Sequence, residues 1–120
     1  MITDTHTHLY SEAFADDRSE MIQRALQLGV TRFFIPAIDS TYTQAMYDLE
    51  QAYPENVFLM AGLHPTYVKE NVQQELAHVA QQLSERKFYA VGEIGIDLYW
   101  DKTFLKEQQE AFRTQIAWAK

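Results

Sequence analysis

Four times along this chain of 120 residues, a short apolar run of strand-like length is followed by a longer amphipathic stretch. The apolar runs lie at about residues 2–6, 33–37, 57–63 and 88–94. Runs of this kind are typical of buried parallel strands, and strands that alternate with helices form parallel sheets with right-handed crossovers. The alternation therefore predicts an α/β fold built from four β-α units.

The first two helical stretches carry signals for where a helix begins and ends. Asp17 and Glu20 have the spacing of a capping box, and Gly29 follows the last apolar position of that stretch. Thr41 and Gln44 have the same spacing at the start of the second stretch. Because a capping box satisfies backbone donors of the first helical turn, we expect a helix to begin at each pair.

The two later helical stretches have apolar residues at helical spacing. In the third stretch these residues are Val72, Leu76, Val79, Ala80 and Leu83. In the fourth stretch, residues 104–120, they are Leu105, Phe112, Ile116 and Ala119. Spacings of three and four place such residues near one face, so each stretch is predicted to be an amphipathic helix.

Four β-α units correspond to half of a (β/α)8 TIM barrel, which typically needs about 250 residues. We therefore expect residues 1–120 to be the N-terminal half of a single barrel domain. The fourth strand would then expose unpaired backbone groups at the sheet edge. The expected partners of that edge are the missing C-terminal half of the barrel or a second copy of the chain. A smaller open βα sandwich is the structural alternative.

Composition and charge narrow the classes of function. The formal net charge is −7, with 17 acidic and 10 basic residues, which disfavours a broad clamp on a phosphate backbone. The sequence has no cysteine, so any bound metal ion must be held by imidazole and oxygen ligands. It also has no apolar run of about 20 residues and no signal peptide, so we expect a cytoplasmic protein without membrane contact.

Polar side chains at two predicted strand ends have the pattern of a metal site. His6 and His8 close the first strand, and Glu93 lies at the end of the fourth. Side chains two residues apart share a face of a strand, and the carboxyl ends of parallel strands meet. Mixed imidazole and carboxylate ligands suit zinc, manganese or iron, whereas a mostly oxygen-lined site suits magnesium. Without a metal, the histidines would be polar strand ends, and Glu93 would pair with a lysine or arginine.

Other residues near the predicted strand ends have two interpretations each. His64, which precedes Pro65, either points into the pocket and contacts a substrate phosphate or hydrogen-bonds within its turn. Tyr99 and Trp100 either stack on a base of a single-stranded substrate or pack within their loop. His78, on a glutamine-rich helix, is expected to face solvent.

Four short segments, in order, form a pattern that spans essentially the whole chain. They are Asp-Thr-His-Thr-His-Leu at 4–9, Gly-Leu-His-Pro at 62–65, Gly-Glu-Ile-Gly-Ile-Asp at 92–97 with the aromatic pair at 99–100, and Gln108, Phe112, Gln115 and Ala117. With these segments the chain resembles the N-terminal half of the TatD-type metal-dependent deoxyribonuclease family, within the amidohydrolase-like TIM barrels. None of the segments is specific alone, whereas their combination is.

The resemblance implies a site and a reaction. His6, His8 and Glu93 match metal ligands of the family, with Glu93 as the catalytic carboxylate that bridges two divalent ions, which are Mg, Zn or Mn. The implied reaction is hydrolysis of DNA phosphodiester bonds by a two-metal mechanism, from an end. The family takes two further histidines and an aspartate from later strands, and none of these lies within residues 1–120. We therefore expect the isolated chain to hold part of the site and to be inactive.

Two other functions fit the same residues. The same ligand set supports hydrolysis of an amide, ester or phosphotriester bond in a small molecule, and the acidic composition favours such a substrate over a long polyanion. The second alternative is a non-catalytic half-barrel that binds metal or a partner chain. Its supporting feature is the short length of the chain.

Overall fold

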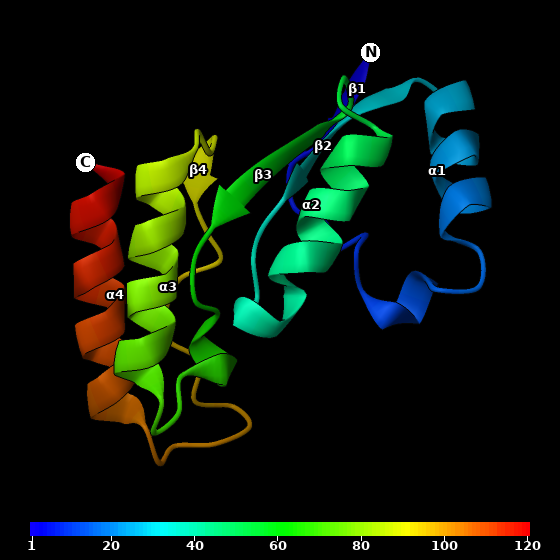
Figure 1. Cartoon of the computed structure of the whole chain (residues 1–120). Coiled ribbons are helices and arrows are strands. Elements are labelled where there is room, and N and C mark those ends of the chain that lie inside the picture. The colour runs from blue at the N-terminus through cyan, green and yellow to red at the C-terminus, as the bar shows by residue number, and fades with distance from the viewer.

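The computed structural model describes all residues, 1–120, as one parallel sheet with helices between its strands. The strands are β1 (Ile2–Asp4), β2 (Val30–Ile35), β3 (Val57–Ala61) and β4 (Ala90–Val91), and the sheet order is β1-β2-β3-β4. The helices are α1 (Arg18–Gln27), α2 (Thr43–Ala52), α3 (Val72–Glu85) and α4 (Leu105–Ala119). Figure 1 shows the helices in this same order across the molecule. The fold prediction is confirmed, because four β-α units in chain order form half of a TIM-type barrel.

The strands differ from their predicted limits mainly at the carboxyl ends. Each observed strand ends two or three residues before its predicted run does. The predicted ends were residues 6, 37, 63 and 94, and the strands end at Asp4, Ile35, Ala61 and Val91. Past β1 and β3 the chain makes single hydrogen bonds instead of a continuous ladder. Thr7 N donates to Phe34 O at 3.2 Å, and His64 N donates to Ile38 O at 2.9 Å. The polar residues at the strand ends are therefore in loops that remain tied to the sheet.

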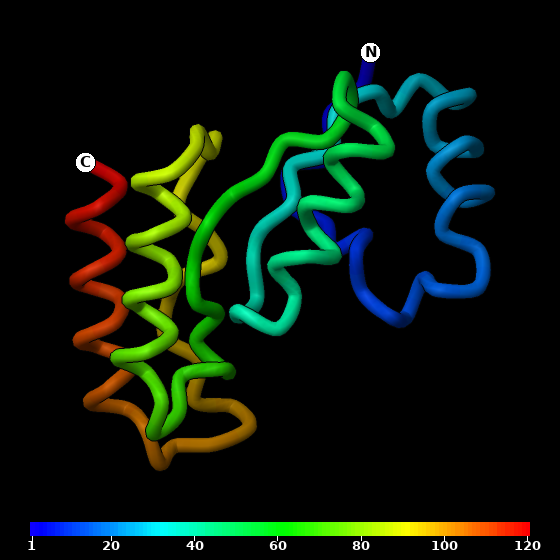
Figure 2. Tube along the Cα trace, viewed as in Figure 1, coloured from blue at the N-terminus to red at the C-terminus, as the bar shows by residue number.

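The hydrophobic core consists of two clusters. The first joins β2 and β3 to α1 and α2 and contains Leu9, Tyr10, Ile22, Phe33, Ile35, Ala37, Met46, Leu49, Val57 and Leu59. The second joins the end of β3 to α3 and α4 and contains Ala61, Leu63, Val68, Val72, Leu76, Val79 and Ala111. The trace in Figure 2 shows α3 and α4 side by side next to β3 and β4. The two clusters meet along β3, which contributes residues to both.

The helix starts are built differently from the predicted capping boxes. Asp17 is the residue before α1, but its side chain makes no capping hydrogen bond. Thr41 lies inside a short 3-10 helix, η2 (Ser40–Tyr42), where its N–H donates to Asp39 Oδ1 at 3.0 Å. Both capping boxes are therefore wrong, although the helices form close to the predicted positions. None of the helices combines the length and the apolar character needed to cross a bilayer.

The α4 helix buries a polar face where an apolar one was predicted. Leu105 and Ile116 are more than one third exposed, whereas Gln108 and Gln115 are buried. The physical reason is that both glutamines bond to backbone groups of loops at the strand ends. Leu63 N donates to Gln115 Oε1 at 2.7 Å, and Asp97 N donates to Gln108 Oε1 at 2.8 Å. These bonds fasten α4 to the segments that follow β3 and β4.

Substituting Gln115→Leu is expected to destabilise the fold although it places an apolar residue in the core. Leu63 N–H would lose its acceptor in a buried position, which costs roughly 1–3 kcal/mol. Urea unfolding measures the change in the free energy of unfolding. Gln23→Leu on the exposed side of α1 is the matched control, since surface substitutions usually stay within about 0.5 kcal/mol. Equal stability of the two variants would contradict this role of Gln115.

The side chains of two α3 residues contact η2 and the first residue of α2. His78 Nε2 lies 2.8 Å from Thr43 Oγ1, so His78 does not simply face solvent as predicted. Buried Glu75 accepts hydrogen bonds from Ser40 N at 3.0 Å and from Ser40 Oγ at 2.7 Å. These contacts give Glu75 and His78 hydrogen-bond partners on the side of α3 that faces η2 and α2.

Candidate metal centre

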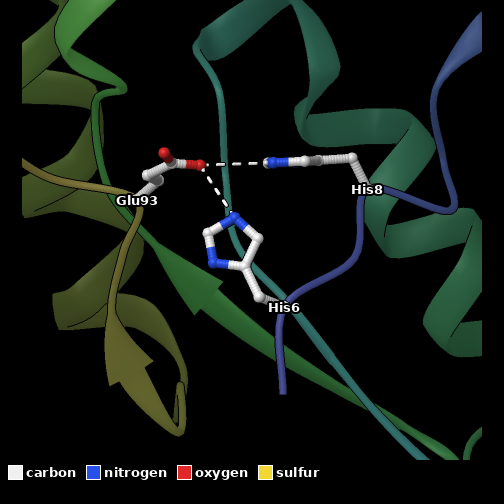
Figure 3. Close-up of side chains that lie close together, drawn as sticks. All are labelled: His6, His8 and Glu93. Carbon is white, nitrogen blue, oxygen red and sulfur yellow. Dashed lines mark hydrogen bonds and ion pairs between the residues drawn. The ribbon is translucent and has the colours of Figure 1, made fainter. Parts of the chain in front are cut away.

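Four polar side chains from three loops meet at the carboxyl ends of the strands. His6 and His8 follow β1, His64 follows β3, and Glu93 follows β4. Glu93 Oε2 lies 3.1 Å from His6 Nε2 and 3.2 Å from His8 Nε2, while Glu93 Oε1 lies 3.2 Å from His64 Nε2. Figure 3 shows the two imidazoles of the first loop directed at one oxygen of Glu93. The ligand atoms of His6, His8 and Glu93 all lie within 4.8 Å of one another.

Glu93 reaches the first loop because the chain after β4 crosses over to the end of β2. Ala37 N donates to Gly92 O at 2.9 Å, and Glu93 N donates to Ala37 O at 3.3 Å. Gly62, at the end of β3 between them, leaves room for this crossing. A Cβ at position 62 would lie 2.8 Å from Gly92 C and 2.9 Å from Gly92 O. The absence of a side chain at Gly62 therefore allows Glu93 to face the histidines that follow β1.

The hydrogen bonds of His8 define which of its ring nitrogens carries the proton. The Tyr10 hydroxyl donates its only proton to Pro36 O at 2.7 Å, and His8 Nδ1 lies 3.0 Å from the same hydroxyl oxygen. That oxygen can therefore only accept from His8, so Nδ1 is the protonated nitrogen. In the neutral ring, Nε2 then presents a lone pair toward Glu93. Burial raises the pKa of the Tyr10 phenol, which keeps its proton in place.

His64 is held in the opposite tautomer. Thr66 N donates to His64 Nδ1 at 3.1 Å, so Nδ1 is unprotonated. His64 Nε2 therefore carries a proton and donates it to Glu93 Oε1 across 3.2 Å. His64 hydrogen-bonds within its turn, as one of the two interpretations predicted, and it also faces Glu93; its contact with a substrate phosphate stays a prediction. As a donor it differs from His8, which offers a lone pair.

The donor set fits a divalent cation. Desolvation lowers the pKa of His8, opposed by the negative charge of Glu93, so the imidazole is favoured in its neutral, ligating form. Neutral His8 then directs a lone pair at a carboxylate oxygen 3.2 Å away. Two lone pairs that face each other at this distance repel, and a positive ion between them removes the repulsion. Imidazole nitrogens combined with a carboxylate are ligands that suit zinc, manganese and iron.

The residues next to Glu93 and His6 differ in whether they contact the cluster or hold its loops. The Glu93 carboxylate lies within 3.2 Å of the three histidine nitrogens and forms no salt bridge with a lysine or arginine, so the predicted alternative partner is not what it contacts. Asp97 Oδ1 accepts from Tyr99 N at 3.0 Å and so holds the loop. Asp4 Oδ1 accepts from the backbone N–H of His6 at 3.1 Å. Tyr99 is 82% exposed and its ring lies edge-on to that of Trp100, with ring centroids 4.7 Å apart.

Two tyrosines beside the site were not singled out in the sequence. Tyr10 contacts His8, and Tyr67 packs edge-on against His64 with ring centroids 5.8 Å apart. Tyr10 follows His8 at the same spacing of two that separates His6 from His8, so the spacing contained a usable signal. No comparable pattern pointed to Tyr67, whose position depends on the short 3-10 helix η3 (Pro65–Tyr67).

A parallel α/β half-barrel with imidazoles and a carboxylate gathered at the strand ends is typical of metal-dependent hydrolases of the TIM-barrel class. The comparison with protein families agrees, since residues 3–120 match the family described as TatD related DNase. The chain belongs to this family, as the sequence predicted.

Individual relatives support the family and show how much of it is present. The chain is 36% identical over 121 residues to a protein of Bacillus subtilis named uncharacterized metal-dependent hydrolase YabD, covering 100% of this chain and 47% of that protein. It is 32% identical to the 3'-5' ssDNA/RNA exonuclease TatD of Pantoea ananatis, covering 97% and 45%. The crystal structure of the TatD homologue YJJV from Escherichia coli superimposes with a TM-score of 0.88 at 32% identity, covering 99% and 46%. The chain thus spans about half the length of these relatives.

Proposed function

We propose that the protein is a divalent-metal-dependent nuclease that hydrolyses phosphodiester bonds of DNA from an end. The observation that carries this proposal is the convergence of His6 Nε2 and His8 Nε2 on one oxygen of Glu93, with the His64 donor at the other oxygen. A carboxylate has two oxygens and is therefore able to hold two cations, one of them between Oε2 and the two imidazoles. The name of the Pantoea ananatis relative, a 3'-5' ssDNA/RNA exonuclease, supports the substrate class.

In this proposal His6, His8 and Glu93 would hold the metal ions, and Glu93 would be the carboxylate shared by two of them. When bound, two divalent ions supply the positive charge that offsets charge developing on a phosphoryl group and lower the pKa of a water molecule. Zinc, manganese and magnesium are the candidates, since the ligands here are imidazole and carboxylate. The remaining ligands are proposed to come from the part of the whole protein that corresponds to the other half of its relatives.

The chain's other residues contribute to substrate binding in the proposed nuclease. His64 carries a proton on Nε2, which lies 3.2 Å from Glu93 Oε1 at the edge of the cluster, so it is suited to donate to a phosphate oxygen. Tyr99 and Trp100 are 82% and 78% exposed in the loop after Glu93. We include Tyr99 as a surface on which a terminal base stacks, because every base has a π-face.

The open edges of the sheet define the proposed arrangement of the whole domain. Within this chain β1 pairs only with β2, and β4 pairs only with β3. Both edge strands therefore carry unpaired backbone groups, which are satisfied when further strands are added. Relatives about twice as long as this chain support a complete barrel in which residues 1–120 are the N-terminal half. Self-association through these edges is the alternative for the chain alone.

The proposed function is tested with the protein in its full natural length. We expect metal-dependent release of nucleotides from single-stranded DNA with zinc, manganese or magnesium, and loss of that release when a chelator is added. A generic carboxylic ester and a phosphotriester are assayed in parallel with the same protein. Hydrolysis of the small esters without release from DNA would favour the alternative of a small-molecule hydrolase. Equal hydrolysis with and without chelator would contradict a metal-dependent mechanism of either kind.

A further inference from the structure

Tyr10 is a buried residue next to the candidate metal centre whose hydroxyl lies between two fixed groups. The side chain is only 4% exposed, and it belongs to the first hydrophobic cluster. Its hydroxyl donates to Pro36 O at 2.7 Å and lies 3.0 Å from His8 Nδ1. Pro36 directly follows β2 and is itself almost fully buried. The hydroxyl therefore connects the loop after β1 with the end of β2.

The direction of these hydrogen bonds assigns a role to the hydroxyl. A carbonyl oxygen only accepts, so the single phenol proton is committed to Pro36. The phenol oxygen then accepts the Nδ1 proton of His8, which leaves Nε2 without a proton in the neutral ring. A histidine that binds a metal through Nε2 needs this tautomer, and a fixed acceptor at Nδ1 also sets the orientation of the ring.

We propose that Tyr10 is a positioning residue that holds His8 in the tautomer and orientation required for metal binding through Nε2. The inference rests on the metal site of the proposed function, which it extends by one residue. Tyr10 touches neither the metal nor the substrate in this proposal. It acts through His8, and the carbonyl of Pro36 acts through Tyr10.

The backbone around Tyr10 is fixed by a separate set of contacts. The Arg18 guanidinium donates to Leu9 O at 2.7 Å, to Tyr10 O at 3.2 Å and to Ser11 O at 2.7 Å. Arg18 is the first residue of α1, so these bonds fasten the loop after β1 to that helix. With the backbone fixed and the ring buried, removal of the hydroxyl alone changes the hydrogen bond to His8 without removing the packing of the ring.

The matched pair of variants is Tyr10→Phe and Tyr42→Phe. Both remove a phenol hydroxyl, and the two rings are neighbours with centroids 5.5 Å apart. The Tyr42 hydroxyl donates to Glu12 Oε1 and not to a residue of the metal site. Tyr42→Phe therefore controls for the loss of a hydroxyl at this end of the first cluster.

The first readout is the tautomer of His8 in the metal-free protein of full natural length, measured by ¹⁵N NMR at a pH well above the imidazole pKa. In the unsubstituted protein and in Tyr42→Phe we expect the proton on Nδ1. In Tyr10→Phe we expect this preference to be lost. A proton on Nε2 of His8 in the unsubstituted protein would overturn the inference without any variant, so the test does not depend on the folding of Tyr10→Phe.

The second readout is the affinity for zinc, measured by calorimetric titration of the same proteins. We expect Tyr10→Phe to raise the Kd for zinc by roughly 10- to 100-fold, which is typical for loss of a group that orients a metal-ligating histidine. Tyr42→Phe is expected to leave the Kd unchanged. An unchanged Kd and an unchanged His8 tautomer in Tyr10→Phe would overturn the inference. If neither the unsubstituted protein nor any variant binds zinc, manganese or magnesium, the proposed metal site fails. The His8 tautomer in Tyr10→Phe then still shows whether Tyr10 holds the proton of His8 on Nδ1.

Discussion

Replacing His6 and His8 together by alanine is expected to abolish stoichiometric binding of a divalent cation by the full-length protein. The two imidazoles supply both nitrogen ligands on the side of Glu93 Oε2, at 3.1 and 3.2 Å from that oxygen. After the double substitution Glu93 would be the only remaining member of the three-residue cluster. A site that loses both of these imidazoles no longer surrounds the ion on the side of Glu93 Oε2, and specific zinc or manganese sites need several ligands in fixed geometry. Isothermal titration calorimetry with each metal measures the loss.

The control for this experiment is His78→Ala, which removes an imidazole from another part of the fold. His78 lies on α3 and contacts Thr43, so its loss leaves the metal cluster untouched. We expect the control to bind with the stoichiometry of the unsubstituted protein. Unchanged binding in the double variant would refute the assignment of His6 and His8 as ligands. Circular dichroism of both variants shows whether the helices are retained.

The β-α order of the chain was predictable because it depends on local patterns. Each apolar run is short and bounded by turn residues, and each helix has residues at spacings of three and four, as Leu76 and Val79 show. The parallel sheet follows from the alternation, since other connections between such strands are rare. The strand ends were less predictable, because β1 and β3 continue past Asp4 and Ala61 through single hydrogen bonds that no local pattern encodes.

The buried face of α4 was not predictable from amphipathicity alone. Apolar periodicity favoured Leu105 and Ile116, yet the helix buries Gln108 and Gln115, whose amides bond to the backbone of Asp97 and Leu63. A hydropathy pattern counts a glutamine as polar and therefore exposed, although a glutamine with backbone partners is well suited to a buried loop junction. The information was in the family resemblance, which included both glutamines.

The composition of the candidate centre was predictable, whereas its internal arrangement was not. Strand ends of a parallel sheet meet at one edge, so His6, His8 and Glu93 were expected near one another. The sequence did not reveal that Glu93 arrives through backbone bonds to Ala37, nor that Tyr10 contacts His8. These contacts join residues far apart along the chain, and their geometry depends on the packed core.

Replacing Glu93 by glutamine is expected to abolish the metal-dependent hydrolysis that we propose. Glutamine keeps the size of the side chain but removes its negative charge and one of the two acceptor oxygens. In Glu93, Oε2 faces His6 and His8 while Oε1 faces His64. The one oxygen of a glutamine cannot take both positions. Charge stabilisation by bound metal ions is worth several kcal/mol in the transition state, which corresponds to a rate loss on the order of 10³-fold.

The measurement is kcat/KM on single-stranded DNA for Glu93→Gln, Glu93→Asp and Glu20→Gln in the full-length protein. Glu20 lies exposed on α1 and is the matched control for loss of one carboxylate, so its variant is expected to keep the rate. Glu93→Asp keeps the charge but shortens the side chain by one methylene. We expect it to lose activity too, because a carboxylate that withdraws from His6 and His8 no longer shares a metal ion with them. A Glu93→Gln variant as active as the control would mean that Glu93 bridges no catalytic metal, and the centre would then be a structural histidine cluster.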